Sequence, residues 1–225
     1  RLATLKALYA ERFYTEAATA FPELLSELSK SSAFSTLAEA RLYYAECLFE
    51  TQQEEKALEY FSLSYQTVID HQLDSAELDY FYLILQGLAV SNSPESTTGA
   101  QWYRRMGAYI TTFRTDDRKA LADWAFAESS LAYYRRDFPM VVRKLEASLE
   151  LGQGVYTKLD FYATYNNLAS IHAENNNFGL ALSNQRLATK YAHGPFSKAE
   201  NLLNEATIQT ELRNDEEALR ILQLA

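Results

Sequence analysis

Small and large apolar residues recur along the chain with a period of about forty residues. The pattern is clearest around six anchor positions, which are Ala17, Ala57, Ala100, Val141, Ala181 and Ala218. Small residues also recur twelve positions before and seven positions after these anchors, and large residues often follow four positions after them. Ala, Gly or Ser fills fourteen of the eighteen positions in the three columns of small residues. The copy around Ala100 fits the repeat least well.

This spacing predicts pairs of antiparallel helices. Twelve residues span a helix, a tight turn and the start of a second helix, and a small residue on each helix lets the two pack closely. A single pair cannot bury its apolar face, so successive pairs stack around a continuous core. We therefore expect an all-α fold of about six helix pairs in one domain, residues 1–225. Its repeats would cover 1–30, 35–71, 75–113, 116–151, 155–192 and 197–225.

Helix-breaking residues divide the chain at the positions that this repeat requires. They lie at Asn92-Ser93 with Pro94 and Ser96, at Thr115-Asp116, at Gly152–Gly154 and at Gly194-Pro195. Pro22 is an exception, because it lies inside a predicted helix and should kink that helix or delay its start. The twelve predicted helices are 2–11, 14–29, 35–50, 54–71, 75–91, 98–113, 116–135, 138–151, 155–174, 177–192, 197–212 and 214–225.

The composition agrees with a helical fold and excludes several other classes of protein. The chain has 225 residues, of which 48% are hydrophobic, and it contains only 7 Gly and 4 Pro. An all-β sandwich or barrel needs more turn residues than this. The single cysteine, Cys47, excludes an internal disulfide and a Cys-rich zinc site, and its apolar neighbours indicate a buried thiol. No apolar run is long enough to span a bilayer, so we expect no membrane insertion within this chain.

The charge is uneven. Residues 1–100 carry 6 basic and 15 acidic side chains, which accounts for the whole net charge of −9, whereas residues 101–144 have 9 basic and 5 acidic ones. The basic stretch has two interpretations, a patch for an acidic ligand or nucleic acid and a set of solvated, locally paired arginines. We favour the second and expect no nucleic-acid binding, because the acidic half would repel a phosphate backbone.

Several segments resemble a tetratricopeptide repeat. The likeness is strongest at residues 165–172 (YNNLASIH) with 177–182 (NFGLAL), and residues 48–61 and 133–145 share it. The period is nearer to the longer variants of kinesin light chains, bacterial peptide-pheromone receptors and large bacterial transcription activators than to the 34 residues of the simplest members. The resemblance implies a right-handed superhelix, an α-solenoid, whose concave groove binds a peptide or protein partner.

The resemblance also implies where a ligand would be held. Relatives often carry an Asn fourteen residues before the anchor, where its amide binds the main chain of an extended peptide. Asn167 and Asn204 match that pattern, Tyr43 and Gln86 are polar departures from it, and Ala127 breaks it. Further groove candidates are Asn166, Ser130, Tyr133 and Ser170. The alternative for the two matching Asn residues is that they cap or brace neighbouring helices. Basic residues that would clamp a ligand's carboxylate are missing from the corresponding positions.

No catalytic constellation is evident. His71, His172 and His193 have no metal-binding spacing, and the chain lacks a nucleophile elbow and a phosphate loop. We therefore expect a non-enzymatic scaffold that needs no cofactor and no metal. One alternative is a sensory or regulatory domain whose effector domain lies outside this sequence. A catalytic helical-repeat protein, with residues converging from different repeats, is a further possibility to which nothing points.

The sequence constrains the cellular compartment and the oligomeric state less than it constrains the fold. An acidic isoelectric point near 4.9 and one cysteine fit a cytoplasmic protein, which we favour, and also a periplasmic one. The chain starts and stops inside repeat helices, so we expect a fragment of a longer protein. Leu219, Leu222 and Leu224 would expose an apolar face on the last helix, through which two copies could form a homodimer.

Overall fold

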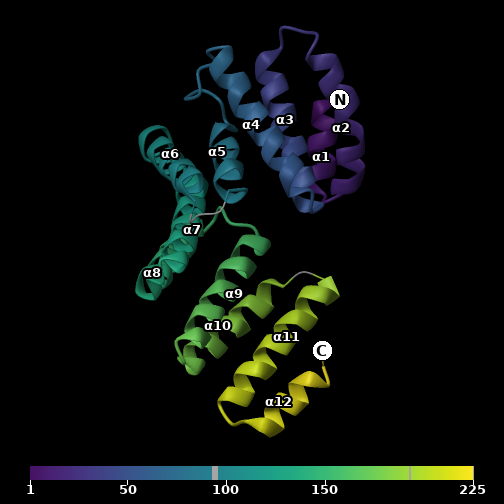
Figure 1. The fold of residues 1–225 in the computed structure, drawn as a ribbon. Coiled ribbons are helices and arrows are strands. Elements are labelled where there is room, and N and C mark those ends of the chain that lie inside the picture. Colours follow the sequence, from purple (N-terminus) through teal and green to yellow (C-terminus); the bar gives the residue numbers. More distant parts are fainter. Residues whose placement is uncertain (93–95, 193, 225) are drawn as a thin grey trace. The chain divides into compact units, whose positions relative to one another are not determined.

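The computed structural model describes residues 1–92, 96–192 and 194–224, and within them it contains twelve helices and no strand (Figure 1). The all-α prediction is therefore confirmed. The predicted breakers Ser93 and Pro94, together with His193 and the terminal Ala225, lie outside the described residues. The helices are α1 (Leu2–Ala10), α2 (Tyr14–Leu28), α3 (Phe34–Glu50), α4 (Glu54–Asp70), α5 (Phe81–Val90), α6 (Thr97–Phe113), α7 (Arg118–Tyr134), α8 (Phe138–Gly152), α9 (Lys158–Glu174), α10 (Phe178–Tyr191), α11 (Gly194–Glu211) and α12 (Asp215–Leu222).

The helices fall into two compact units, Arg1–Phe113 and Arg114–Ala225. The first contains α1–α6 and the second α7–α12, so each holds three of the predicted helix pairs. Within each unit the strongest packing is between the two helices of a pair, such as α3 with α4 and α7 with α8. The placement of both units in one domain, residues 1–225, stays a prediction.

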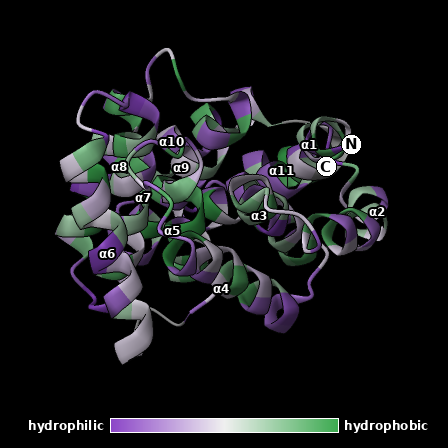
Figure 2. Cartoon of the chain, turned by 90° about the horizontal axis from the view of Figure 1, so that it is seen from above, coloured by the Kyte–Doolittle hydropathy of each residue, from purple (hydrophilic) through white to green (hydrophobic). Residues whose placement is uncertain are grey.

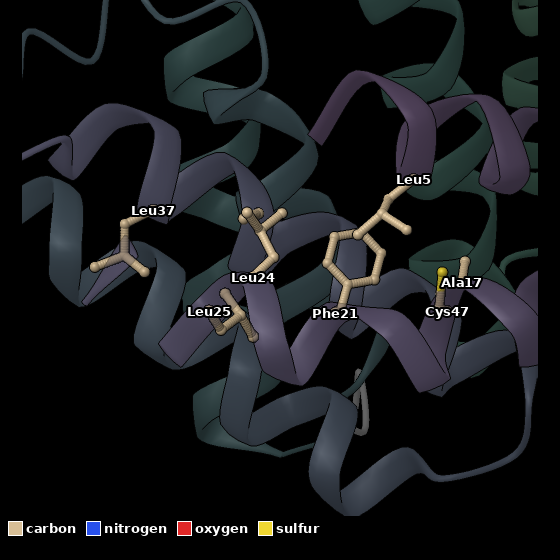
Figure 3. Packing of buried hydrophobic residues seen from close by; sticks show 8 residues of the cluster. Leu5, Ala17, Phe21, Leu24, Leu25, Leu37 and Cys47 are labelled. Atoms are coloured by element: carbon tan, nitrogen blue, oxygen red, sulfur yellow. The ribbon is translucent and has the colours of Figure 1, made fainter. Parts of the chain in front are cut away.

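Anchor residues and their companions form the core, as the repeat predicts. In the first unit Ala17 and Ala57 are fully buried, and the large rings of Phe21 and Phe61 lie one turn further along. Figure 3 shows Phe21 beside Leu5 within a cluster that joins α1, α2 and α3. The helices are amphipathic, and Figure 2 shows hydrophobic and hydrophilic residues side by side along them.

The second unit has the same repeat core, but one of its large core positions is polar. Val141 and Leu145 on α8 pack against Leu168 and Ile171 on α9. In the next repeat the position of Leu145 is taken by Gln185, which is only 2% exposed. Its side-chain amide donates hydrogen bonds to Asn201 and, at 3.4 Å, to Asn166. The contact between α10 and α11 is therefore partly a hydrogen-bonded polar one.

A common turn joins the two helices of a pair. Five residues before the anchor the backbone is left-handed, with φ between 55° and 66°, and none of these residues is Gly. The next amide bonds back to the carbonyl five residues earlier, as in Asp137 N to Ala132 O at 3.0 Å. This is the Schellman arrangement, which ends one helix and starts the next. The left-handed residues are Arg12, Gln52, Arg136, Asn176 and Arg213.

The third repeat differs from the sequence prediction in two ways. Its first helix begins at Phe81 and not at residue 75, because residues 74–80 form turns in which the Asp74 carboxylate accepts from Ala76 N at 3.0 Å. Its second helix buries Gly99 and Tyr103, whereas the predicted companion of Ala100, Arg104, is exposed. The anchor of this copy is therefore Gly99, one residue earlier than predicted.

Pro22 does not delay the start of its helix, which was one of its two predicted effects, since α2 begins at Tyr14 and continues through the proline to Leu28. Other boundaries lie within three residues of their predicted positions. The capping box of Thr157 and Asp160 sets the start of α9 at Lys158, where the prediction was residue 155.

Candidate functional site

A pocket in the second unit is the best-formed candidate for a binding site among the described residues. It is formed by α7, α8 and α9 and has a volume of about 320 Å³. This lies at the lower end of the range for ligand pockets, so it suits one or two side chains of a larger ligand. The lining residues are Ser129, Ser130, Tyr133 and Tyr134 from α7, Val141 and Leu145 from α8, and Asn167, Ser170, Ile171 and Glu174 from α9.

The floor of the pocket is apolar and belongs to the repeat core. Val141 is the anchor of its repeat, Leu145 is the large residue one turn later, and Ile171 packs against both in one buried cluster. Ser129 belongs to a column of small residues and is 3% exposed. Because small side chains on α7 leave the apolar atoms of α8 within reach, the repeat pattern itself produces a hollow here.

The rim of the pocket is polar. The Tyr133 hydroxyl donates a hydrogen bond to Glu174 Oε1 at 3.1 Å, which links α7 to α9. This hydrogen bond, more than any other influence, raises the pKa of the Tyr133 phenol, so the tyrosine stays protonated as a donor. Asn167 and Ser170 are exposed, and Ser170 Oγ donates to Asn166 O at 3.0 Å. The rim therefore offers an amide, hydroxyl groups and a carboxylate above an apolar floor.

Four of the eight predicted groove residues line this one pocket, namely Asn167, Ser130, Tyr133 and Ser170. They come from α7 and α9, which are the first helices of neighbouring repeats, and their role in binding stays a prediction.

The other four predicted residues lie elsewhere. Asn166 is half-buried and accepts a hydrogen bond from Gln185, which links α9 to α10. Asn204 is half-buried on α11 and is not among the lining residues. Tyr43 and Gln86 belong to the first unit, where Tyr43 packs edge-to-face on Tyr9 at 5.3 Å between ring centroids. A role for these four in binding stays a prediction.

Sequence reasoning missed Glu174 and Tyr134, although a signal for Glu174 was present. Asn167, Ser170, Ile171 and Glu174 are spaced i, i+3, i+4 and i+7, which places them on one face of α9. Extending the predicted face by one turn from Ser170 would have included the carboxylate. Tyr134 follows Tyr133 directly, and only the structure shows that both side chains line the hollow.

Other kinds of site would need particular arrangements of the remaining histidine, cysteine, acidic and basic side chains within residues 1–92, 96–192 and 194–224. Among the described residues no group of three or more His, Cys, Asp or Glu is placed to hold a metal ion. Cys47 is buried, as predicted, and burial raises the pKa of its thiol to about 12. Part of the basic excess at 101–144 is paired, since Lys119 Nζ contacts Asp123 at 2.6 Å and Lys144 Nζ contacts Glu128 at 2.5 Å. No helix in the described part of the chain is long and apolar enough to cross a membrane.

The fold is shared with solved structures of very different sequence. No family model matches the chain, and no curated protein matches it. BtubC (BKLC) from P. vanneervenii is 14% identical, with a TM-score of 0.70 over 95% of this chain and 88% of that one. NprR in complex with its cognate peptide NprX is 10% identical, with a TM-score of 0.71 over 97% of this chain and 62% of that one.

The apo form of the quorum sensor NprR from B. thuringiensis gives similar values, 11% identity and a TM-score of 0.72 over 98% of this chain. The chain spans 62% and 61% of the length of the two NprR chains. At such low identity these comparisons concern the fold alone. Together with the repeated helix pairs they confirm the tetratricopeptide-like helical-repeat fold predicted from the sequence.

Proposed function

We propose that this protein is a non-catalytic scaffold that binds a peptide or an extended protein segment through the α7–α9 pocket. The observation that carries the proposal is the pocket lining, in which Ser130, Tyr133, Asn167 and Ser170 surround a buried apolar floor. An amide supplies a donor and an acceptor for main chain, and the floor accepts an apolar side chain. A peptide-bound structure of the similar fold, NprR with NprX, supports the same class of ligand.

A peptide array tests this proposal. The full chain is incubated with an array of random octapeptides, and the bound spots are compared with those of Asn167→Ala and Ser170→Ala. We expect both variants to keep their helical circular dichroism, because both side chains are exposed, and to lose most of the capture.

Matched controls are available on α10. Ser183 is exposed and Asn184 is half-buried, and like Ser170 each donates its side-chain hydrogen bond to the carbonyl four residues earlier. Asn184→Ala and Ser183→Ala should therefore bind as the parent chain does. Equal capture by all four variants would contradict the assignment of this pocket.

The second candidate function is sensory: the chain would detect a peptide for an effector domain outside this sequence. It is favoured by the fold likeness to NprR, which is described as a quorum sensor and is longer than this chain. Both functions use the same pocket, and reading the complete gene separates them. An effector domain in the same polypeptide supports the sensor, and its absence supports the simple scaffold.

A further inference from the structure

Glu174 places a carboxylate in the lining of the pocket. It is the one charged side chain among the ten described residues that line the hollow. Its Oε1 accepts the Tyr133 hydroxyl, but a carboxylate has two oxygens and about four acceptor positions. Capacity therefore remains for a donor from a ligand. An ammonium or guanidinium nitrogen makes the strongest such hydrogen bond, because both partners are then charged.

Two tyrosine rings lie beside this carboxylate. The Tyr133 and Tyr134 ring centroids are 6.2 Å apart and their planes are inclined by 80°. The side chains are 45% and 49% exposed, which is a large apolar area to leave in water. Aromatic faces attract a cation within about 6 Å of the ring centroid. Carboxylate and rings together thus offer a cation a charge partner and an amphipathic wall.

On this basis we propose that the pocket selects ligands with a cationic group at its Glu174 end and an apolar side chain on the floor of Val141, Leu145 and Ile171. The proposal rests on the proposed peptide-binding function and specifies its ligand. The cation would be a Lys or Arg side chain or a peptide's amino terminus, since all present N–H donors with a positive charge. An acidic residue at that position is disfavoured by like charge.

Nearby basic residues modify this preference without reversing it. Arg135 and Arg136 follow α7 directly and are exposed, and neither is among the lining residues. Their charges oppose a bound cation, but solvent and salt screen exposed charges. Glu174 instead contacts the ligand directly across a hydrogen bond. Replacing Arg136 by Gln should therefore tighten the binding of a cationic peptide.

The test uses four dye-labelled peptide probes and fluorescence anisotropy with the full chain. Three are acetylated peptides of sequence Gly-X-Leu-Ala-Gly-Gly, in which X is Lys, norleucine or Glu. The fourth is norleucine-Leu-Ala-Gly-Gly with a free amino terminus. We expect the Lys probe or the free-amine probe to bind about tenfold more tightly than acetylated norleucine, and the Glu probe to bind least. Which of the two cationic probes binds better identifies the source of the charge.

Glu174→Gln is the decisive variant. It keeps the shape and removes the charge, so the preference of the tighter cationic probe over acetylated norleucine should fall to about one, whereas binding of acetylated norleucine should stay unchanged. Glu146→Gln on α8 is the matched control, because Glu146 is exposed and lies outside the lining. It makes the same charge change in the same unit and should keep the tenfold ratio. Circular dichroism of both variants checks the fold.

The possible results separate this inference from the function on which it rests. If acetylated norleucine binds as tightly as both the Lys probe and the free-amine probe, and Asn167→Ala weakens all three, then the pocket binds peptides and the charge preference is wrong. A ratio that persists in Glu174→Gln also overturns the preference. If no probe binds and no array peptide depends on Asn167, then the proposed function fails with it.

Discussion

The left-handed residues at the repeat turns hold the backbone in a strained conformation, and this strain can be measured one residue at a time. Arg136 has φ 55° and Gln52 has φ 61°. An L-residue with a β-carbon is strained there by about 1–2 kcal/mol, and Gly is not. Gly also has a larger entropy in the unfolded state, which offsets part of this gain. Gly at either position should therefore raise the free energy of unfolding by about 0.5–1 kcal/mol.

Urea denaturation of Arg136→Gly and Gln52→Gly measures this effect. Gln53→Gly is the control, since its φ is −101° and Gly there relieves no strain, adds unfolded-state entropy and removes the side-chain hydrogen bonds with Thr51 and Lys56. The control should destabilise the protein. Destabilisation by all three substitutions would show that the turns are not strained.

Two helix glycines mark places where an aromatic ring approaches the backbone closely. A β-carbon on Gly87 would lie 2.2 Å from the Phe61 ring, and one on Gly152 would lie 2.4 Å from the Tyr156 ring. Alanine at either position must displace a packed ring, so we expect a loss of about 1–3 kcal/mol in a thermal or urea unfolding experiment. Gly179 is the matched control, because a β-carbon there meets no atom within 4 Å and Ala is the better helix former. Equal stability of Gly87→Ala and Gly179→Ala would contradict the packing described here.

Glu46 should make the stability of the first unit depend on pH. Burial, and then the neighbouring Glu50 carboxylate, raise the pKa of Glu46 from 4.5 to about 7, although a hydrogen bond from Tyr9 opposes the rise. The folded state thus holds the proton more tightly than the unfolded state. The stabilisation is fully present below pH 4.5 and is lost as the pH rises through about 7.

Melting temperatures at several pH values between about 5 and 8 test this. The parent chain should lose stability across that range through this group, and Glu46→Gln, which stays neutral, should lose less. Glu55→Gln is the control, since Glu55 is exposed on α4 and should leave the slope unchanged. Identical slopes in the parent and Glu46→Gln would show that the carboxyl titrates in its ordinary range.

At the scale of the helices, the contact between α10 and α11 contains a buried pair of amide side chains and an ion pair. Gln185 and Asn201 are both buried and hydrogen-bonded to each other, and Arg186 pairs with Glu205 at 2.9 Å beside them. Buried polar partners are costly to separate singly, because the group left behind loses its hydrogen bond. Gln185→Ala should therefore cost about 1–3 kcal/mol.

Hydrogen exchange followed by mass spectrometry locates this effect. In Gln185→Ala the amides of α11 and α12 should exchange faster than in the parent chain, while those of α7 and α8 should keep their protection. The matched substitution Gln153→Ala removes an exposed amide after α8 and should change neither region. Uniform loss of protection throughout α7–α12 would mean that the polar contact does not act locally.

Helix existence was easier to predict than helix start or register. The small-residue columns placed all twelve helices because each column lies in a buried contact between helix neighbours. They failed in the third repeat, where the apparent anchor Ala100 lies one residue after the buried Gly99. Both residues are small, so composition alone could not choose between them. Arg104 indicated that the register was wrong, because the position four residues after an anchor is normally large and apolar.

The candidate site was only half predictable for a related reason. Asn167, Ser170, Ser130 and Tyr133 follow from the position of each first helix in the repeat. Asn166 looks equivalent in sequence to its neighbour Asn167, yet its side chain turns toward Gln185. One position on a helix rotates a side chain by about 100°, so adjacent Asn residues take opposite roles.

For the chain as a whole, self-association through α12 stays a prediction. Leu219 is 62% exposed and Leu222 is 47% exposed on that helix. If two copies cover these side chains, light scattering at high concentration should give twice the 25.7 kDa of one chain. Leu219→Glu with Leu222→Glu should restore the single-chain mass. A strict monomer in the parent chain would contradict the homodimer.

A peptide held in the pocket of α7, α8 and α9 should perturb the residues that line it. A titration of the ¹⁵N-labelled full chain with the tightest array peptide, followed by NMR, shows which residues the ligand perturbs. We expect the largest shifts on the pocket residues Ser130, Tyr133, Asn167, Ser170 and Glu174, and little shift in α12 and the first unit. Saturable shifts confined to other helices, with these five resonances unchanged, would contradict it.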